Sequence, residues 1–276
     1  MDRAWKRFSA NRGAIFGGVV VLFACLIALT ADVIAPYPID QRSEKLAPPS
    51  QQHWLGTDTN EKDVLTWVIY GSRLSLTAGG LSIVLAIFIG VPLGAAAGYF
   101  PGAVDQAIMR SIDVVLAFPA ILIALLVMAA LAPGWPAVIV AVGLINIPIF
   151  ARQIRATTLT LRSHEYVTAA VAAGATTRHI FIWTLLPGLV GPLVVLATLG
   201  LGSAILEVAG LSFLGISGDP TTPEWGGMLA EAKNDLSTSV WPAIAPGFAI
   251  SLTILGFNLL GDGLRDALDP RLEGSR

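Results

Sequence analysis

Three polar side chains interrupt stretches of sequence that are otherwise apolar: Asn146, Glu207 and Asn258. A charged group in the hydrocarbon of a membrane costs several kcal/mol unless it faces protein or water, so we expect Glu207 to face the interior of a helix bundle. There it could contact a polar solute, pair with a partner subunit, or lie near the outer interface of the bilayer. The three residues are candidates for lining a path through the membrane.

A second candidate site is a short cationic segment, residues 165–187, between long apolar runs. Ser163 could cap a helix, with Glu165 in the first turn at the positive end of the dipole. Small side chains recur at helical spacing on one face, and Gly174 stands where a left-handed helix end favours glycine. The segment could enter a groove in a partner or be a solvated connector. The candidate residues are Glu165, Tyr166, Thr168, Ala169, Ala170, Ala173 and Gly174.

The sequence lacks the residues that bind nucleotide phosphates. It contains no G-x-x-x-x-G-K-[ST] loop, and none of its lysines follows a glycine in that pattern. We therefore predict no catalytic residue in this chain. If ATP drives the protein, it must be hydrolysed elsewhere.

The composition is that of an integral membrane protein. Hydrophobic residues make up 54% of the 276 residues and charged residues only 13%, and the mean hydropathy is +0.71. A helix crosses the hydrocarbon with roughly 20 residues, so the longest uncharged run, 114–151, is long enough for two spans, with a turn at residues 132–136. This gives six spans. The uncharged runs are residues 13–31, 74–104, 114–151, 180–206 and 236–261.

The basic residues indicate the orientation of the spans. Those on the side that carries both termini are Arg3, Lys6, Arg7, Arg12, Arg110, Arg152, Arg155, Arg162, Arg178, Arg265, Arg271 and Arg276. Those on the other side are Arg42, Lys45, Lys62, Arg73 and Lys233. The excess predicts cytoplasmic termini. It also divides His53 from His164 and His179, so we predict no metal site.

The first apolar run could instead be a cleaved signal peptide, because basic residues precede it and residues 22–25 faintly resemble a lipoprotein cleavage box. Its uncharged core is longer than such signals, and more apolar sequence follows Cys25. Cys25 is the only cysteine, so no internal disulfide can form. We therefore favour a membrane helix.

Two segments on the outer side break the apolar pattern. Residues 36–73 begin rich in proline and become helix-like at 63–70, which predicts an extended strap leading into an interfacial helix. Residues 218–241 begin with turn chemistry, and a helix is expected at 228–236. In that segment Trp225 and Trp241 could anchor the chain at the membrane interface or receive an outer partner; anchoring is the commoner role.

The segment at 165–187 resembles the EAA loop of ABC-importer permeases, in which Ala169-Ala170, Gly174 and Leu186-Pro187 have the matching order and spacing. The resemblance implies a cytoplasmic helix that docks onto an ATPase subunit. Thr168 stands where the motif usually has glutamate and Thr184 where it usually has isoleucine. These departures bear on the salt-bridge part of the docking, not on the helix itself.

Further motifs resemble the dipeptide, oligopeptide and nickel permeases of the DppC/OppC type, and the similarity covers nearly the whole chain. Residues 60–62 and Trp67 depart from that pattern. The matching motifs are HWLGTD at 53–58, YGSRLSL at 70–76, LSFLG at 211–215, PTTPEWGGML at 220–229 and NLLGDGLRDALDPRL at 258–272.

The resemblance implies an all-α integral membrane protein with six transmembrane helices, the type I ABC-importer transmembrane domain. Residues 1–73 would form the cytoplasmic tail, first helix and outer strap. Residues 74–264 would form a five-helix core with the coupling loop at 156–186, and residues 265–276 a cytoplasmic tail. The chain would lie in a bacterial inner membrane, in contact with lipid and without nucleic acid.

The implied partners are a homologous second permease, two ABC ATPases that bind ATP and magnesium, and an extracytoplasmic substrate-binding protein. The chain itself would bind no cofactor. Peptides are the favoured cargo; nickel, opines, glutathione and oligosaccharides are alternatives. Two other classes stay open from the residues alone: a proton-coupled secondary transporter using Glu207, and a membrane scaffold. Sequence halves that repeat would favour the former, and none is seen.

Overall fold

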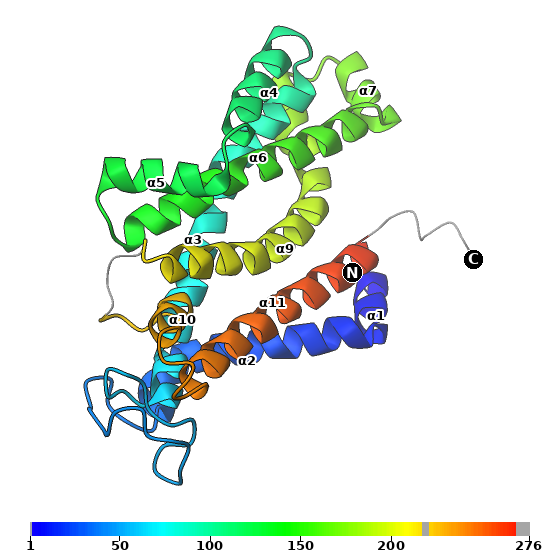
Figure 1. Cartoon of the computed structure of the whole chain (residues 1–276). Helices are drawn as coiled ribbons and strands as arrows, with labels where there is room; N and C mark the ends of the chain where they lie inside the picture. Colours follow the sequence, from blue (N-terminus) through cyan, green and yellow to red (C-terminus); the bar gives the residue numbers. More distant parts are fainter. Residues whose placement is uncertain (1, 217–220, 269–276) are drawn as a thin grey trace.

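The computed structural model describes residues 2–216 and 221–268, and helices dominate it (Figure 1). In the first half of the chain they are α1 Asp2–Ala10, α2 Arg12–Ile34, α3 Val64–Tyr99, α4 Ala103–Leu116, α5 Ala120–Leu131 and α6 Trp135–Arg162. The second half has α7 Glu165–Ala172, α8 Thr177–His179, the π-helical segment η1 Ile180–Leu185, α9 Leu186–Phe213, α10 Trp225–Ala232 and α11 Trp241–Leu268. The predicted all-α class is confirmed. Arg271, Arg276 and most of the predicted C-terminal tail lie outside the described residues.

Within the described residues, five helical runs are long and apolar enough to cross a membrane: α2, α3, α6, the run Thr177–Phe213 and α11. The pair α4 and α5, bent by 92°, is a sixth crossing if it is counted as one span. The bend lies at residues 117–119, because Pro119 has no N–H to donate and its ring disfavours a helical conformation at Phe118. The predicted turn at 132–136 is confirmed, since α5 ends at Leu131 and α6 begins at Trp135.

Helices α3 and α6 form the centre of the bundle and approach each other through glycines. Gly90, Gly94 and Gly98 recur every four residues on α3, and a Cβ on any of them would overlap α6. At Gly94 the overlap would be with the backbone of Ala151. Small residues at this spacing let membrane helices pack backbone to backbone. Phe150 of α6 is fully buried in the apolar core beside this contact.

Helix α2 lies along α11 and is also tied to α3 (Figure 1). Gly17 lies against the backbone of Gly256, so the two helices are close there. The Arg73 guanidinium donates to both carboxylate oxygens of Asp32, with Nη2 2.7 Å from Oδ2. Helix α2, the first of the spanning helices, is therefore packed onto the bundle rather than separate from it.

The start of α3 corrects one prediction. We expected a separate interfacial helix at 63–70, but α3 runs without a break from Val64 to Tyr99. Asp63 caps it, because its Oδ2 accepts hydrogen bonds from Thr66 N at 2.8 Å and Thr66 Oγ1 at 2.7 Å. No residue near 73 stops the helix, so the predicted domain boundary there falls inside it.

Helix α4 is held against α6 by charge. Arg155 places two guanidinium nitrogens on the Asp105 carboxylate at 2.5 and 2.6 Å. One turn away along α6, Arg152 Nη2 lies 2.5 Å from Asp113 Oδ1. The Arg155–Asp105 pair is bidentate, which fixes orientation as well as contact, so it helps to set how α4 lies on α6.

Candidate functional site

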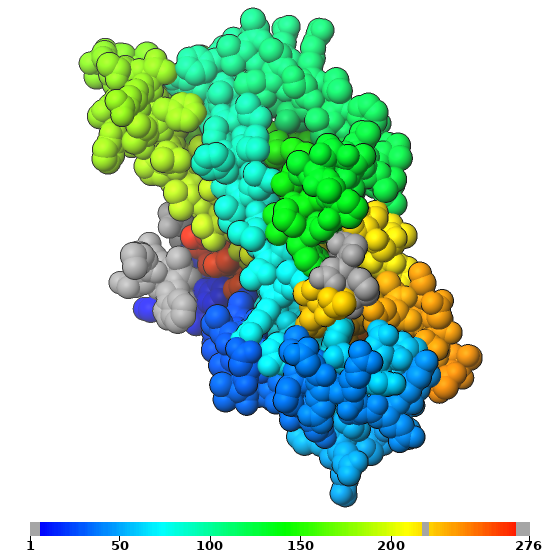
Figure 2. Space-filling view, turned by 90° about the vertical axis from the view of Figure 1, so that its left-hand side faces the viewer, coloured from blue at the N-terminus to red at the C-terminus, as the bar shows by residue number. Residues whose placement is uncertain are grey.

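The polar features gather at the two ends of the bundle. Figure 2 shows the strap, residues 36–63, at one end of the molecule, with α10 beside it. Residues 165–185, which include α7, protrude at the opposite end (Figure 2). The spans between them carry the three polar candidates for a path.

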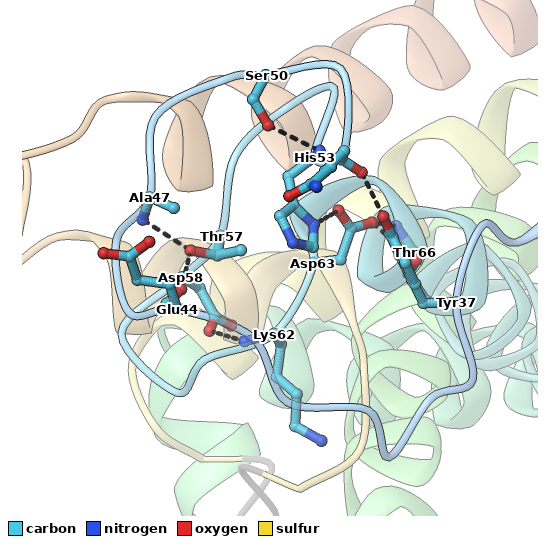
Figure 3. A network of polar contacts seen from close by, with 11 residues as sticks. Tyr37, Glu44, Ala47, Ser50, His53, Thr57, Asp58, Lys62, Asp63 and Thr66 are labelled. Atoms are coloured by element: carbon cyan, nitrogen blue, oxygen red, sulfur yellow. Dashed lines mark hydrogen bonds and ion pairs between the residues drawn. The ribbon is translucent and has the colours of Figure 1, made fainter.

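The strap is folded on itself by hydrogen bonds (Figure 3). His53 Nδ1 lies 2.8 Å from Asp63 Oδ1, so the strap is joined to the residue that caps α3. Thr57 links two parts of the strap, because its Oγ1 donates to the Glu44 carbonyl at 2.5 Å and accepts from Ala47 N at 2.8 Å. The segment is thus less extended than its prolines indicate.

Asp58 anchors the tip of the strap that faces α10. One carboxylate oxygen accepts from the backbone N–H groups of Asn60 and Lys62, both at 2.8 Å. Burial raises the pKa of Asp58 above its ordinary value, although these hydrogen bonds act in the opposite direction. Asn60 in turn donates from Nδ2 to Glu231 Oε2 at 2.9 Å, and this bond joins the strap to α10.

Glu231, on α10, has a strongly raised pKa. Burial, and next the charge of Asp58, raise its pKa from 4.5 to about 7, while the hydrogen bond from Asn60 lowers it. At the contact between strap and α10, the charge of Asp58 therefore disfavours the charged form of Glu231.

Helix α10 is fastened to the bundle by Glu224, which the sequence analysis missed. Its Oε2 accepts from Gly227 N at 2.8 Å, as a helix cap, and its Oε1 accepts from Ser75 Oγ of α3 at 3.3 Å. The side chain is 1% exposed. Burial raises the pKa of Glu224, against several hydrogen bonds that lower it. An acidic residue three positions before Gly227, directly after a proline-rich turn, was the available signal.

Two predictions about this outer segment are wrong. The helix begins at Trp225 instead of 228 and ends at Ala232 instead of 236, because Glu224 supplies the cap. Trp225 is not an interface anchor: it is 3% exposed, and its Nε1 donates to the Val68 carbonyl at 2.9 Å. Trp241, in contrast, is 40% exposed at the start of α11, as an anchoring residue would be.

Helix α7 presents the face that the sequence analysis singled out. Glu165, Tyr166, Thr168, Ala169, Ala173 and Gly174 are exposed, and Ala170 is partly buried. The helix begins after His164; Ser163 instead ends α6 and donates to the Thr160 carbonyl, so the predicted serine cap is wrong. Gly174 has φ +76°, which confirms the left-handed helix end.

A small apolar cluster holds α7 to the bundle. Val167, 1% exposed, packs with Ile180 and Leu185 of the residues that lead into α9. Tyr99, at the end of α3, packs against the same cluster. The opposite face of α7 is left open to solvent or to another protein.

Two of the three polar candidates meet inside the bundle. Asn146, 1% exposed, donates from Nδ2 to Glu207 Oε2 at 2.7 Å and to the Val142 carbonyl at 2.9 Å. Glu207 is partly exposed. Asn258 is not part of this contact: it is exposed on α11, and a Cβ on Gly202 of α9 would lie 3.5 Å from its Oδ1. Their function stays a prediction.

The described residues contain no cluster of three or more His, Cys, Asp or Glu side chains arranged to hold a metal ion. Among the histidines, His53 is bonded to Asp63, while His164 directly precedes α7 and lies edge-on to the Tyr166 ring.

Comparison with known proteins accounts for this arrangement. Residues 90–274 match the family of binding-protein-dependent transport system inner membrane components. Residues 1–49 match the N-terminal transmembrane domain of oligopeptide transport permease C.

Relatives match over nearly the full length. The dipeptide transport system permease DppC of Alkalihalophilus pseudofirmus is 40% identical, over 98% of this chain and 90% of the relative. The di/tripeptide permease DppC of Pseudomonas aeruginosa is 41% identical, over 98% of this chain and 92% of the relative. The glutathione permease GsiD of Pectobacterium atrosepticum is 42% identical, over 98% and 90%.

A solved structure shares the fold. A chain of the MetNI methionine ABC transporter superposes with a TM-score of 0.61 at 19% identity, covering 74% of this chain and 96% of that one. From the matched family and the full-length relatives, the chain belongs to the binding-protein-dependent transport system inner membrane components and is a multi-pass permease subunit of an ABC importer.

Proposed function

We propose that this permease imports di- or oligopeptides, as one of two homologous subunits that share a central path. The cargo assignment rests on relatives named for dipeptides, di/tripeptides and glutathione, which align along 98% of the chain at 40 to 42% identity. Family membership as an ABC importer permease sets aside the secondary transporter and the scaffold considered from the residues alone.

Coupling to the ATPases is assigned to α7. Its exposed face of small side chains allows close approach, while Val167 fixes it to the end of the bundle. Glu165, Tyr166, Thr168, Ala169, Ala170, Ala173 and Gly174 form the contact. Two ATPases dock, one on each permease, and they bind the ATP and magnesium that the importer uses. This chain binds no cofactor, and by itself it has no ATPase activity.

The two ends of the bundle indicate which face of the permease each partner contacts. With α7 facing the ATPases, both termini lie in the cytoplasm, which agrees with the excess of basic residues on that side. The strap and α10 then face outward, toward a substrate-binding protein. The chain lies in a bacterial inner membrane.

Asn146, Glu207 and Asn258 are proposed to line the path. The hydrogen bond from Asn146 to Glu207 holds the carboxylate at a partly exposed position within the bundle. Glu207→Gln keeps the shape and removes the charge, so transport should fall while the importer still assembles. If the variant fails to co-purify with its partners, Glu207 is a structural group and this part of the proposal is wrong.

The cargo is tested by reconstituting the complete importer in proteoliposomes, with its second permease, ATPases and binding protein. We expect ATP-dependent uptake of labelled di- and tripeptides, and none of nickel ions or oligosaccharides. Uptake of nickel without peptide uptake would overturn the assignment. ATP hydrolysis by the purified chain alone would contradict the proposal that only the ATPase subunits hydrolyse ATP.

A further inference from the structure

A cavity of about 440 Å³ lies between α6, α9 and α11, at the end of the bundle that carries α7. Its wall on α9 is mainly apolar and includes Val195, Leu196 and Leu199. Two polar side chains complete the lining: Gln153 of α6 and Arg265 of α11. Toward this end α9 curves away from α11 (Figure 1).

The helical register connects this cavity to the proposed path. Gln153 follows Asn146 on α6 by seven residues, and Arg265 follows Asn258 on α11 by seven. Seven residues make nearly two turns, so each pair lies on one face of its helix, roughly 10 Å apart along the axis. Both faces therefore carry one of the proposed path residues within the span and another polar group at the cavity.

Arg265 is exposed and has no carboxylate partner in residues 2–216 and 221–268. The nearby Asp266 instead accepts a hydrogen bond from Asn11 Nδ2 at 3.3 Å. In contrast, Arg152 and Arg155 of α6 are both paired with acids of α4. The cavity thus combines an apolar wall with a guanidinium that no carboxylate of the described residues neutralises, which is complementary to the carboxylate of a bound molecule.

We propose that this cavity is the inner section of the path, and that Arg265 and Gln153 bind the terminal carboxylate of a peptide before it leaves. The α9 wall takes the apolar side chains of the same peptide. This inference rests on the proposed peptide import. It goes further by naming a site in the permease that recognises the carboxylate, separate from the choice made by the binding protein.

The test measures binding in the intact importer held in nanodiscs of neutral lipid, without the binding protein. Cys25→Ala removes the only native cysteine of this chain, and Val195→Cys, labelled before assembly with the partner subunits, carries an environment-sensitive fluorophore in the cavity wall. The dipeptide Ala-Phe is compared with its C-terminal amide. We expect the free acid to bind more tightly, and Arg265→Gln to weaken binding of the acid about tenfold without weakening binding of the amide, which has no carboxylate.

Matched variants sharpen the result. Arg265→Lys should retain part of the preference, because it keeps the charge without the planar fork. Arg110→Gln removes an exposed positive charge on α4, outside the cavity, and should leave both affinities unchanged. Equal binding of acid and amide, or an equal loss of both in Arg265→Gln, would overturn the proposal.

Two further arms identify the source of the anion and separate this inference from the cargo assignment. If anionic lipid alone produces the signal and peptide cannot reverse it, Arg265 binds a lipid headgroup and the proposal fails. If the importer takes up no peptide, the proposed cargo is wrong. In that case, binding of a simple carboxylate such as hexanoate that is lost in Arg265→Gln would still support an anion site at Arg265. If hexanoate does not bind, the anion site is overturned as well.

Discussion

The short helices α10 and α7, at the two ends of the bundle, are attached to it in different ways. Helix α10 is fixed by a buried polar network: Glu224 is 1% exposed and bonded to Gly227 and Ser75, while Trp225 is bonded to Val68. Helix α7 is held mainly by the apolar cluster around Val167, and its other face is open. The difference indicates that α10 is an integral part of the fold, whereas α7 is a surface presented to another protein.

The largest effect is expected at Glu224. Glu224→Ala removes the cap of α10 and leaves buried donors unpaired, at a cost of about 3 kcal/mol. The purified chain should unfold at lower temperature, and protease should cut first near α10. Glu224→Gln keeps most of the shape and should lose less. Unchanged melting of Glu224→Ala would show that α10 is not held by this residue.

At α7 the effect should fall on coupling rather than on folding. Gly174→Asp forces a residue with a side chain to adopt a positive φ, and it places a negative charge at the helix C-terminus. Each effect costs about 1 kcal/mol. The variant should insert normally and lose peptide uptake, with its ATPases released or hydrolysing without transport. Nothing lies within 4 Å of a Cβ at Gly174, so Gly174→Ala isolates the backbone part and should be milder. If Gly174→Asp takes up peptide at the parental rate with its ATPases still bound, α7 is only a connector and the coupling role is contradicted.

The contact between strap and α10 should respond to pH. The pKa of Glu231 is raised from 4.5 to about 7 in the folded protein, so the folded state holds the proton more tightly than the unfolded state. Stability should therefore be highest near pH 5 and fall as pH rises through about 7. Glu231→Gln should flatten this dependence in thermal unfolding followed from pH 5 to 8. If the stability of the wild-type protein does not change from pH 5 to 8, the raised pKa of Glu231 is contradicted.

The smallest effect is expected at Thr168, which is exposed on α7. Thr168→Glu should change stability by less than about 0.5 kcal/mol, because the site is on the surface. Uptake should also be retained, since the family usually has glutamate at this position. A clear loss of uptake would mean that the ATPase partner requires the smaller side chain.

Sequence alone predicted the features that depend on local composition. Apolar runs located five spanning helices, but the span expected from residue 114 is broken by the 92° bend between α4 and α5. Gly174 marked a helix end that the structure confirms at φ +76°. The missed features depend on neighbours distant in the chain. Anchoring at the interface was the favoured role for Trp225 because indoles are common there, yet its hydrogen-bond partner is Val68, which hydropathy cannot identify.

The path residues illustrate the same limit. Asn146 and Glu207 stand 61 positions apart, and nothing in either run predicted that they would bond to each other and not to Asn258. Ser163 was a plausible cap by type, but the first turn of α7 starts one residue later. Short-range rules are uncertain by a residue at helix ends, and that residue decides which side chain caps.

The glycine contact between α3 and α6 has a mechanical consequence. Because the two backbones touch at Gly94 and Ala151, neither helix can slide past the other without a steric clash. α3 starts beside the strap, and α6 ends just before α7. The pair therefore resists sliding along its contact, and it links the strap at one end of the bundle to α7 at the other.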